Sequence, residues 1–309
     1  MAVTGSGTQA DPFIVHSYQE LKSICDNLTT KQEGANYVNL ANDIDCNDYG
    51  DSFEWETLKL SEYGRAGSMV WRYYIVFDMC GHTIKNVLVK ANNRLFTHEI
   101  NAVGDGVKIR NGKILNIFNN GIDHLIYSST GDCPIVIENV SLSVNGNGIT
   151  NVVFRSARFN RCSIYFTRST RCPNNIFMVW ESGVVINNCD IYLDCAFLGK
   201  LIFECASGNG YINISNSRFR GKCNFDASIS NNLLASRLSS CVIDMELTNT
   251  SGIYAWYLSS DNSTGVVNSS KIHTEPTYYT PGMIRVTDAE LHSAASLQAK
   301  GFNVVKVGG

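Results

Sequence analysis

Two groups of carboxylates in this 309-residue chain have the residue types and spacing that metal binding or acid–base chemistry requires. Asp43, Asp45, Asp48 and Asp51 in "NDIDCNDYGD" imitate the beginning of a calcium loop, in which carboxylates at alternate positions bind the ion. Asp48, however, occupies the position at which an EF-hand requires glycine for its sharp turn. We therefore interpret Asp43 and Asp45 as part of a structural cap, and we expect no metal and no other cofactor.

The second group would suit cleavage of a carbohydrate, which needs paired carboxylates, or calcium with a basic residue, in one exposed groove. Asp190 and Asp194 in "NCDIYLDC" share a face if their strand is continuous, and Asp244 with Glu246 in "VIDMEL" could neighbour them several repeats away. Outward-facing, solvated carboxylates are the default for such a pattern. We predict no catalytic residue among them, and a polysaccharide-cleaving enzyme stays open as an alternative.

Basic and aromatic clusters are the remaining candidates for binding. A run of arginines could hold an anionic sugar or an acidic neighbouring subunit, although a solvated face is the usual explanation: Arg155, Arg158, Arg161, Arg168 and Arg171. Aromatic residues near the C-terminus are of the kind that lines sugar-binding surfaces and protein interfaces, and about half of them should be core by strand alternation: Tyr254, Trp256, Tyr257, Tyr278 and Tyr279.

Composition excludes several classes of partner. The formal net charge is −3 and the basic residues are scattered, so we expect no nucleic-acid or anionic-membrane partner. No apolar run is long enough to span a membrane, and "AVTGSGTQADPF" after Met1 lacks the regions of a signal peptide, which predicts a soluble protein made in the cytoplasm. The eleven cysteines include no CxxC pair, so we predict free thiols and no zinc site.

A short phrase repeated along the chain determines the fold class that we predict. Copies such as "IRNGKIL", "FNRCSIY" and "VINNCDIYL" align on a small anchor residue, with steps of 22 to 29 residues between copies; the anchors are Gly112, Val140, Cys162, Cys189, Ser217, Cys241 and Ser270. An apolar residue lies three positions before and two positions after every anchor. The position just before the anchor holds Asn111, Asn139, Asn188 and Asn216, and it is Arg161, Ser240 and Ser269 in the other copies.

Each phrase is therefore predicted to form a strand, a sharp bend and a second strand. Asn tolerates the left-handed backbone of such a bend, and stacked Asn side chains can form hydrogen-bonded ladders. Segments between the phrases, such as "YYIVF", "IYFT" and "GYINI", are rich in β-branched and aromatic residues, and helical periodicity is scarce. The repeat predicts a single right-handed parallel β-helix, with the cysteines at anchor positions stacked inside as small hydrophobes and Cys80 near them.

The open ends of a β-helix need caps because their strand edges invite aggregation. Ser17 and Glu20 form a capping-box pattern that opens a short amphipathic helix with Leu21 and Ile24 on its apolar face. Thr287 and Glu290 repeat the pattern before an apolar series that ends at Gly301: Leu291, Ala294, Ala295 and Leu297. We divide the chain into an N-terminal cap (1–60), coils (61–285) and a C-terminal capping helix with tail (286–309).

The ends of the chain resemble a known group. Gly5, Gly7, Thr8, Asp11 and Pro12, followed by the "LANDID" strand at 40–45, stand where right-handed, pectate-lyase-like β-helix proteins of bacteriophage appendages have their N-terminal cap. "FDMCGHTIKN" is similar to their first full coil, and "GFNVVKVGG" looks like the end of phage-borne members. The resemblance implies a homotrimeric head fibre, tail spike or decoration subunit.

We therefore expect a structural virion protein, made in the host cytoplasm, that contacts other virion proteins of the capsid, neck or tail and host surface polysaccharide. A polysaccharide lyase or glycoside hydrolase of the same fold is the first alternative. A bacterial adhesin-like module is the second.

Overall fold

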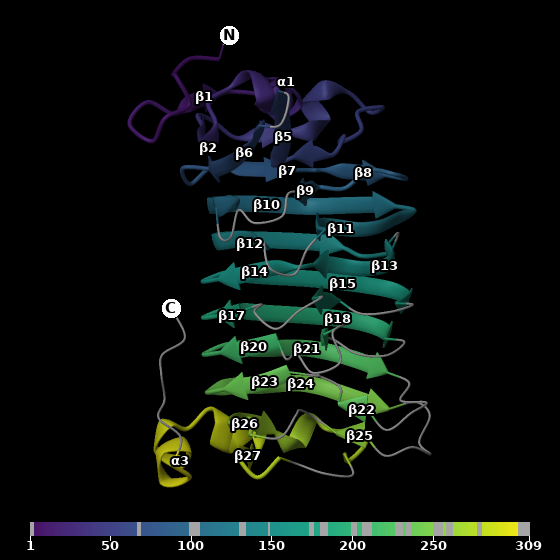
Figure 1. Ribbon diagram of the computed structural model, residues 1–309. Helices are drawn as coiled ribbons and strands as arrows, with labels where there is room; N and C mark the ends of the chain where they lie inside the picture. The colour runs from purple at the N-terminus through teal and green to yellow at the C-terminus, as the bar shows by residue number, and fades with distance from the viewer. Residues whose placement is uncertain are drawn as a thin grey trace.

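The computed structural model describes residues 3–66, 69–98, 106–129, 134–147, 149–172, 176–179, 185–198, 203–205, 212–225, 231–232, 236–249, 256–257, 262–276 and 280–301. Within these residues the chain winds into a parallel β-helix, an elongated stack of coils with short helices near both ends (Figure 1). The all-β solenoid with capping helices that the sequence predicts is thereby confirmed.

Two sets of stacked strands meet at the sharp bend of each coil. The strands before the bend, which we call the first arm, are β1 (Phe13–Val15), β2 (Gly34–Leu40), β6 (Met69–Asp78), β14 (Ala157–Asn160), β17 (Val185–Asn187), β20 (Ile212–Ser215) and β23 (Ser236–Ser239). The strands after the bend, the second arm, are β3 (Ile44–Asp45), β7 (Thr83–Lys85), β15 (Ser163–Cys172), β18 (Asp190–Leu198), β21 (Arg218–Phe225) and β24 (Cys241–Asn249). Two long strands continue through the bend into both arms: β10 (Lys108–Asn120) and β12 (Ile135–Asn145).

A six-stranded parallel sheet closes the coil on its third side: β4 (Leu58–Lys59), β9 (Phe96–His98), β11 (Ile122–Ser128), β13 (Ile149–Arg155), β16 (Phe177–Val179) and β19 (Phe203–Cys205). Three shorter strands lie beside these stacks: β8 (Leu88–Lys90), which pairs with the end of β10, and β22 (Asn231–Asn232), which pairs with β25 (Trp256–Tyr257). One hairpin departs from the parallel pattern, because β5 (Ser61–Ala66) pairs antiparallel with β6.

The two apolar columns of the repeat form the core. Their members before the anchor, Ile109, Ile137, Phe159, Ile186, Ile214, Leu238 and Val267, and those after it, Ile114, Leu142, Ile164, Ile191, Phe219, Ile243 and Ile272, are all buried. In the first six copies each member is the in-register neighbour of the next one along the stack. Because each coil buries the same two positions against its neighbours, the coils share one continuous core.

The bends have the left-handed backbone that the sequence predicts. The residue before the anchor has a φ between 49° and 57° in six of the seven copies: Asn111, Asn139, Arg161, Asn188, Asn216 and Ser240. The Asn ladder is also present, since the Nδ2 of Asn139 donates to the Oδ1 of Asn111 at 3.1 Å and Asn111 donates to Asp78. A second left-handed column begins at Asn86 and Asn116, whose amides are joined in the same way.

The seventh copy, "VNSSKIH", does not form a bend. Ser269–Lys271 is a 3₁₀ helix (η4), and the Oδ1 of Asn268 accepts from the backbone N–H of Ser270 as its cap. Val267 in the strand β26 (Gly265–Asn268) is accordingly in register with Ile243 rather than with Leu238. Asn favours helix caps as well as left-handed bends, so the same residue type serves a helical turn here, and β27 still stacks on β26 beyond it.

Caps cover both ends of the stack. Helix α1 (Tyr18–Asp26) buries Leu21 and Ile24 as predicted; its N-cap Ser17 accepts from Glu20 N, whereas the Glu20 carboxylate accepts from His16 N at 2.7 Å. Short 3₁₀ turns follow at η1 (Leu28–Thr30) and η2 (Cys46–Tyr49). No described helix is long and apolar enough to cross a membrane.

The C-terminal cap contains two short helices instead of the one that the sequence predicts. Thr287 and Glu290 form the full capping box of α2 (Asp288–Leu291), but Ser293 then caps a separate helix, α3 (Ala294–Ala299). Ala294 and Ala295 are exposed, contrary to the expected apolar series, while Leu297 packs with Val266 and with Val286 of β27 (Met283–Val286). The division at 60 and 285 stays a prediction, although β2 within the first segment already pairs with β6.

The cysteines at anchor positions behave as predicted. Cys162, Cys189 and Cys241 are buried, and all eight cysteines whose side chains are described are free thiols. Cys80 is exposed, so the expected stack does not extend to it. A further buried stack, which the repeat did not reveal, pairs Cys195 with Cys223 in register.

Candidate functional site

The outward side chains of the second arm form the candidate site, and we call this surface the polar face. Because strand residues alternate, every second residue of β10, β12, β15, β18, β21 and β24 points away from the buried column. Parallel registration then lines these residues up in three rows along the stack. The rows are Lys113, Ser141, Ser163, Asp190, Arg218 and Val242; Ser143, Tyr165, Tyr192, Arg220 and Asp244; and Asn145, Thr167, Asp194, Lys222 and Glu246.

A stacked pair of tyrosines lies in the middle of the polar face. The rings of Tyr165 and Tyr192 are 4.5 Å apart between centroids and inclined by only 5°. Tyr165 is 46% exposed, which is far above the value for a core aromatic side chain. At this distance the two rings stack face to face, so the pair presents ring edges and hydroxyl groups to solvent, held in place by in-register strands.

An ionic ladder occupies the downstream part of the polar face. The β21 strand carries Arg218, Arg220 and Lys222, and carboxylates lie on the strands to either side of it. Arg220 Nε donates to Asp190 Oδ1 at 3.0 Å, and Lys222 Nζ lies 3.5 Å from Asp194 Oδ1. These pairs hold the ladder in a fixed pattern of charge across three coils.

An open hollow of about 380 Å³ lies over this ladder. Tyr192, Asp194, Arg220, Lys222 and Glu246 are among the residues that line it. Glu246 is exposed and, among the described residues, has no ion-pair partner, although Lys222 is its neighbour in register. The hollow thus combines an aromatic edge with charges of both signs, which suits a polar ligand rather than an apolar one.

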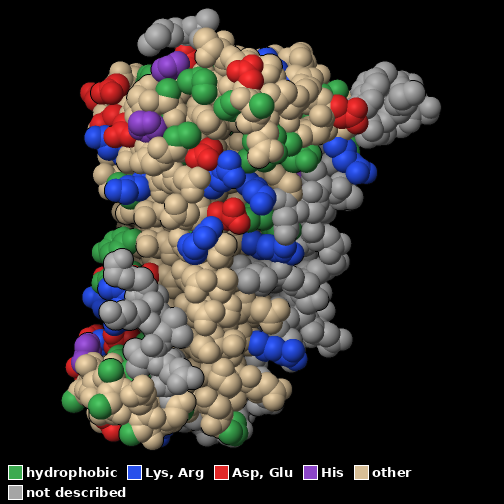
Figure 2. All heavy atoms as spheres, turned by 90° about the vertical axis from the view of Figure 1, so that its left-hand side faces the viewer, with side chains coloured by type: hydrophobic (Ala, Val, Ile, Leu, Met, Phe, Trp, Pro, Cys, Tyr) green, Lys and Arg blue, Asp and Glu red, His purple; other side chains and the backbone are tan. Residues whose placement is uncertain are grey.

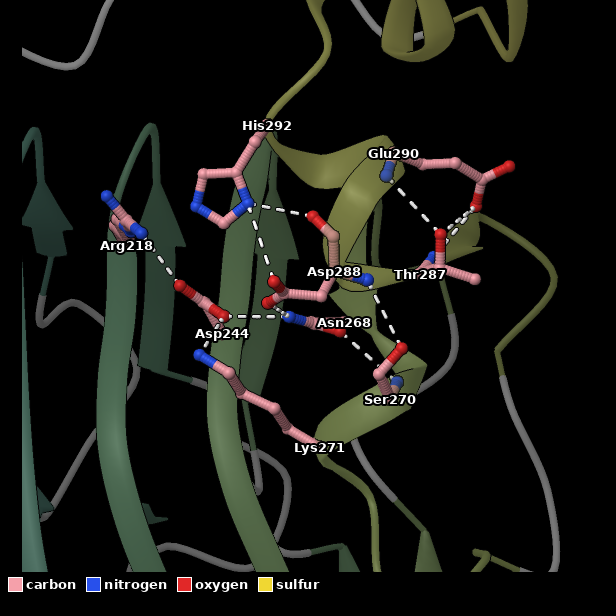
Figure 3. A network of polar contacts seen from close by, with 9 residues as sticks. All are labelled: Arg218, Asp244, Asn268, Ser270, Lys271, Thr287, Asp288, Glu290 and His292. Atoms are coloured by element: carbon pink, nitrogen blue, oxygen red, sulfur yellow. Dashed lines mark hydrogen bonds and ion pairs between the residues drawn. The ribbon is translucent and has the colours of Figure 1, made fainter.

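Asp244 links the ladder to the C-terminal cap (Figure 3). Its carboxylate, 6% exposed, accepts from Arg218 Nη2 at 2.7 Å, Lys271 Nζ at 2.8 Å and Asn268 Nδ2 at 2.9 Å. Asn268 also donates to Asp288, the first residue of α2. Burial alone would raise the pKa of Asp244, but donation from Lys271, Asn268 and Arg218 outweighs it and lowers the pKa below the ordinary value.

The four carboxylates predicted as candidates for carbohydrate chemistry are thus brought to one face, but not as acid pairs. Asp190 and Asp194 share that face because β18 is unbroken, and Asp244 with Glu246 lies two strands along the stack. The basic strand β21 runs between the two acidic strands, and Asp190, Asp194 and Asp244 are each paired with a cation.

The calcium-like sequence serves as a cap. Asp43 Oδ1 accepts from Thr83 N at 2.9 Å and lies 3.2 Å from His82 Nδ1, and Asp45 is held by Asn47 N and by the side chains of Asn86 and Lys85. These contacts, with donation from Thr83 to Asp43 and from Asn86 to Asp45 foremost, lower both pKa values.

Glu54 stands at the twelfth position counted from Asp43 and would complete a calcium loop, but it is paired with Lys90. Asp48 and Asp51 point to solvent. Among the described residues no group of three or more His, Cys, Asp or Glu side chains is placed to hold a metal ion.

The arginine run is dispersed over the coil. Arg155 lies over the Tyr127 ring at 4.9 Å, Arg168 is buried and donates to the carbonyls of Gly146 and Ile149, and Arg161 is exposed at a bend. Arg158 lies on the first arm, in register with Val136. The side chain of Arg171 and those of the C-terminal aromatic cluster (Tyr254, Trp256, Tyr257, Tyr278 and Tyr279) lie outside the described residues.

The residues that sequence reasoning missed are Tyr165, Tyr192, Lys113 and the cations of β21. A signal for them exists in the repeat: Tyr165 and Tyr192 each lie three residues after the anchor of their own copy, Cys162 and Cys189. Aligning the outward positions of the copies, and not only the apolar ones, would have placed these rings next to each other.

Comparison with known proteins supports the fold alone. No protein-family model matches the chain, and no curated protein is significantly similar to it in sequence. A solved structure from Bacteroides ovatus, described as that of a candidate immunoglobulin A1 protease, superposes with a TM-score of 0.56 at 17% identity. The match covers 99% of this chain and 95% of that protein, so the two share an architecture over essentially their whole length.

Proposed function

We propose that this protein is a structural attachment subunit: a rigid β-helical rod whose polar face binds glycan. The observation that carries the proposal is the exposed, parallel Tyr165–Tyr192 pair between two polar stretches of the same face. The exposed part of such an aromatic pair can contact the C–H side of a sugar, and neighbouring hydroxyl and charged groups can bind the sugar's hydroxyls. Stacked coils keep these groups in place, so little conformational entropy is lost when a glycan binds.

The electrostatics of the face favour binding over hydrolysis. A general acid for glycoside cleavage needs a carboxyl whose pKa is raised, so that it is protonated near neutral pH. The pKa of Asp244 is shifted in the opposite direction by its three donors. Asp190 and Asp194 are engaged by Arg220 and Lys222.

A polysaccharide-cleaving enzyme is the second candidate, and Glu246 is the observation that favours it. This exposed carboxylate borders the hollow beside Lys222 without an ion-pair partner among the described residues. Incubating the protein with polysaccharide separates the two proposals, because cleavage releases oligosaccharides and binding does not.

We assign the rod, more specifically, to a bacteriophage particle, as a homotrimeric fibre, spike or decoration subunit that contacts other virion proteins and host surface polysaccharide. This assignment comes from the resemblance in residues 5–12 and 40–45. Light scattering of the purified protein tests the trimer, and a stable monomer with no affinity for virion components would refute this form of the proposal.

Affinity electrophoresis against a panel of bacterial capsular and cell-wall polysaccharides tests the attachment function. We expect Tyr165→Ala and Tyr192→Ala to weaken binding about tenfold each, because a stacked aromatic contact contributes roughly 1–1.5 kcal/mol. Phe118→Ala is the matched control, since Phe118 is 47% exposed but does not belong to the three rows of the polar face. Equal loss in all three variants, or loss in none, would overturn the proposal.

A further inference from the structure

A second hollow, of about 340 Å³, lies at the upstream end of the polar face, beside the bends. Lys113, Ser141 and Ser163, three consecutive members of one row, line it together with Asn139 and Arg161 of the bend column. Figure 2 looks onto the side of the rod toward which β14, β17, β20 and β23 point in Figure 1, and it shows several Lys and Arg side chains around mid-height, with Asp or Glu side chains among them.

The two cations of this hollow differ from those downstream. Arg218, Arg220 and Lys222 are each paired with a carboxylate. Lys113 and Arg161 are exposed, and neither has an ion-pair partner in the part of the chain that the structure describes. Their positive charge is therefore available to a ligand.

Glu138, a nearby carboxylate, does not neutralise these two cations. It lies before the bend of β12, on the first arm, where its in-register neighbour is Arg110. The hollow is on the other side of that bend, and its lining contains no Asp or Glu.

Arg161 also stands where the fold would favour another residue. Its φ is 54°, a left-handed conformation that suits Asn, and the adjacent coils have Asn139 and Asn188 at this position. An arginine here adds backbone strain and, within the described part of the chain, forms no ion pair in return. Residues that break a local rule without a structural gain tend to mark functional positions.

We infer that this hollow binds an anionic group, so that the ligand of the polar face is an acidic glycan carrying carboxylate, sulfate or phosphate substituents; the inference rests on the proposed function. Lys113 and Arg161 would bind the anion, and the hydroxyls of Ser141 and Ser163 would donate hydrogen bonds to it. Ser163 and Tyr165 are two residues apart on β15, which corresponds to about 7 Å, so a single glycan chain can reach both the hollow and the aromatic pair.

The test compares dextran with dextran sulfate of matched chain length, using calorimetry on the full-length protein. The variant is Lys113→Gln with Arg161→Asn, in which Asn restores the residue type of the neighbouring bends. The control is Lys59→Gln with Arg285→Gln, which removes two positive charges outside the polar face. Polygalacturonate, which carries carboxylates in place of sulfates, distinguishes the two kinds of anion.

We expect the wild type to prefer dextran sulfate or polygalacturonate over dextran, and the preference to shrink as salt rises. The double variant should lose about tenfold in affinity for the preferred acidic polymer, because each of the two exposed ion pairs contributes a factor of about three to five. Its affinity for dextran should not change. The control should bind every polymer as the wild type does.

Two results would overturn the inference: a wild type that binds both acidic polymers no better than dextran, or a double variant that binds them as tightly as the wild type. If Tyr165→Ala and Tyr192→Ala still weaken binding in that case, the attachment function stands without the anion site. If only the double variant weakens binding, the anion site stands and the aromatic attachment surface fails.

Discussion

The Asp244 network should determine how firmly the C-terminal cap is held on the stack. Replacing Asp244 with Asn keeps the shape of the side chain but removes its charge. The amide oxygen can still accept hydrogen bonds on one side of the group, whereas the amide nitrogen on the other side would face a cation. Arg218 and Lys271 would then lose their shared carboxylate, while each retains about a third of its side-chain surface in water.

The size of the effect follows from that burial. Breaking a fully buried ion pair costs about 3–5 kcal/mol, because one charge is left uncompensated, whereas exposed pairs contribute about 0–1 kcal/mol. Asp244 is almost fully buried but its partners can rehydrate, so we expect a loss of about 2–3 kcal/mol. In a stack where each coil contacts mainly its neighbours, this loss should fall on the terminal coils and not on the whole rod.

Hydrogen exchange followed by mass spectrometry measures the loss of stability in each coil directly. A loss of 2–3 kcal/mol corresponds to exchange that is about 30 to 150 times faster. Peptides that cover β24, β26 and β27 should show it in Asp244→Asn, and peptides from β10 and β12 should be unchanged. Glu275→Gln is the control, because the Glu275–Arg285 pair lies in the same cap but is about half exposed on both sides.

The reasoning would be refuted if Asp244→Asn exchanged like the wild type, or if exchange rose equally in every coil. Acid provides an independent check on the wild type. Because the folded pKa of Asp244 is lowered, its contribution to stability is complete above the ordinary value of about 4 and is lost as pH falls through the folded value. The part of the faster exchange below about pH 4 that depends on Asp244 should therefore be absent from Asp244→Asn, whereas the part that depends on Glu290 of α2, whose pKa is lowered by donation from Thr287, should remain.

Three further changes test other parts of the fold. Burial lowers the pKa of His98 to about 4, so its contribution to stability is complete above about pH 6.5 and falls by roughly 3 kcal/mol towards pH 4. In His98→Asn, whose side chain can still contact Ser61, the free energy of unfolding measured with denaturant should no longer show this fall between about pH 6.5 and about pH 4. Asn139→Val should cost about 1–2 kcal/mol in thermal unfolding, because a β-branched residue is disfavoured at a φ of 52°, whereas Asn139→Gly should be close to neutral. Gly221→Ala should cost about 3 kcal/mol or more, because the new Cβ would lie 2.0 Å from the carbonyl oxygen of Leu193 at a φ of 102°; a soluble variant of wild-type stability would contradict the described backbone.

The coil could be predicted from the sequence because its signal is repeated. The buried columns through Ile109 and Ile114 recur in each copy, and burial in a parallel stack demands the same residue class at the same place on every coil. The left-handed bend was predictable for the same reason, since Asn111 and its counterparts recur at one position.

The ends and the surface could not be predicted in that way. At the last copy, Ser269 stands at the bend position, but Asn268 before it caps the 3₁₀ helix η4, which replaces the bend. In the C-terminal cap, Ser293 interrupts a helix that periodicity alone predicts as continuous. The Asp244 network joins β21, β24, β26, η4 and α2, whose relative placement depends on how the last coil ends.

The outward rows follow a different constraint from the core, and this bears on function. A core position must be apolar on every coil, but an outward position is free to change from coil to coil without affecting the stack. On the polar face the changes are ordered: hydroxyls with an exposed lysine upstream, a tyrosine pair in the middle, and a ladder of paired charges downstream. Ion pairing fixes the downstream part, whereas Lys113 and Arg161 have no ion-pair partner among the described residues, so the positive charge that remains for a ligand lies at the upstream end.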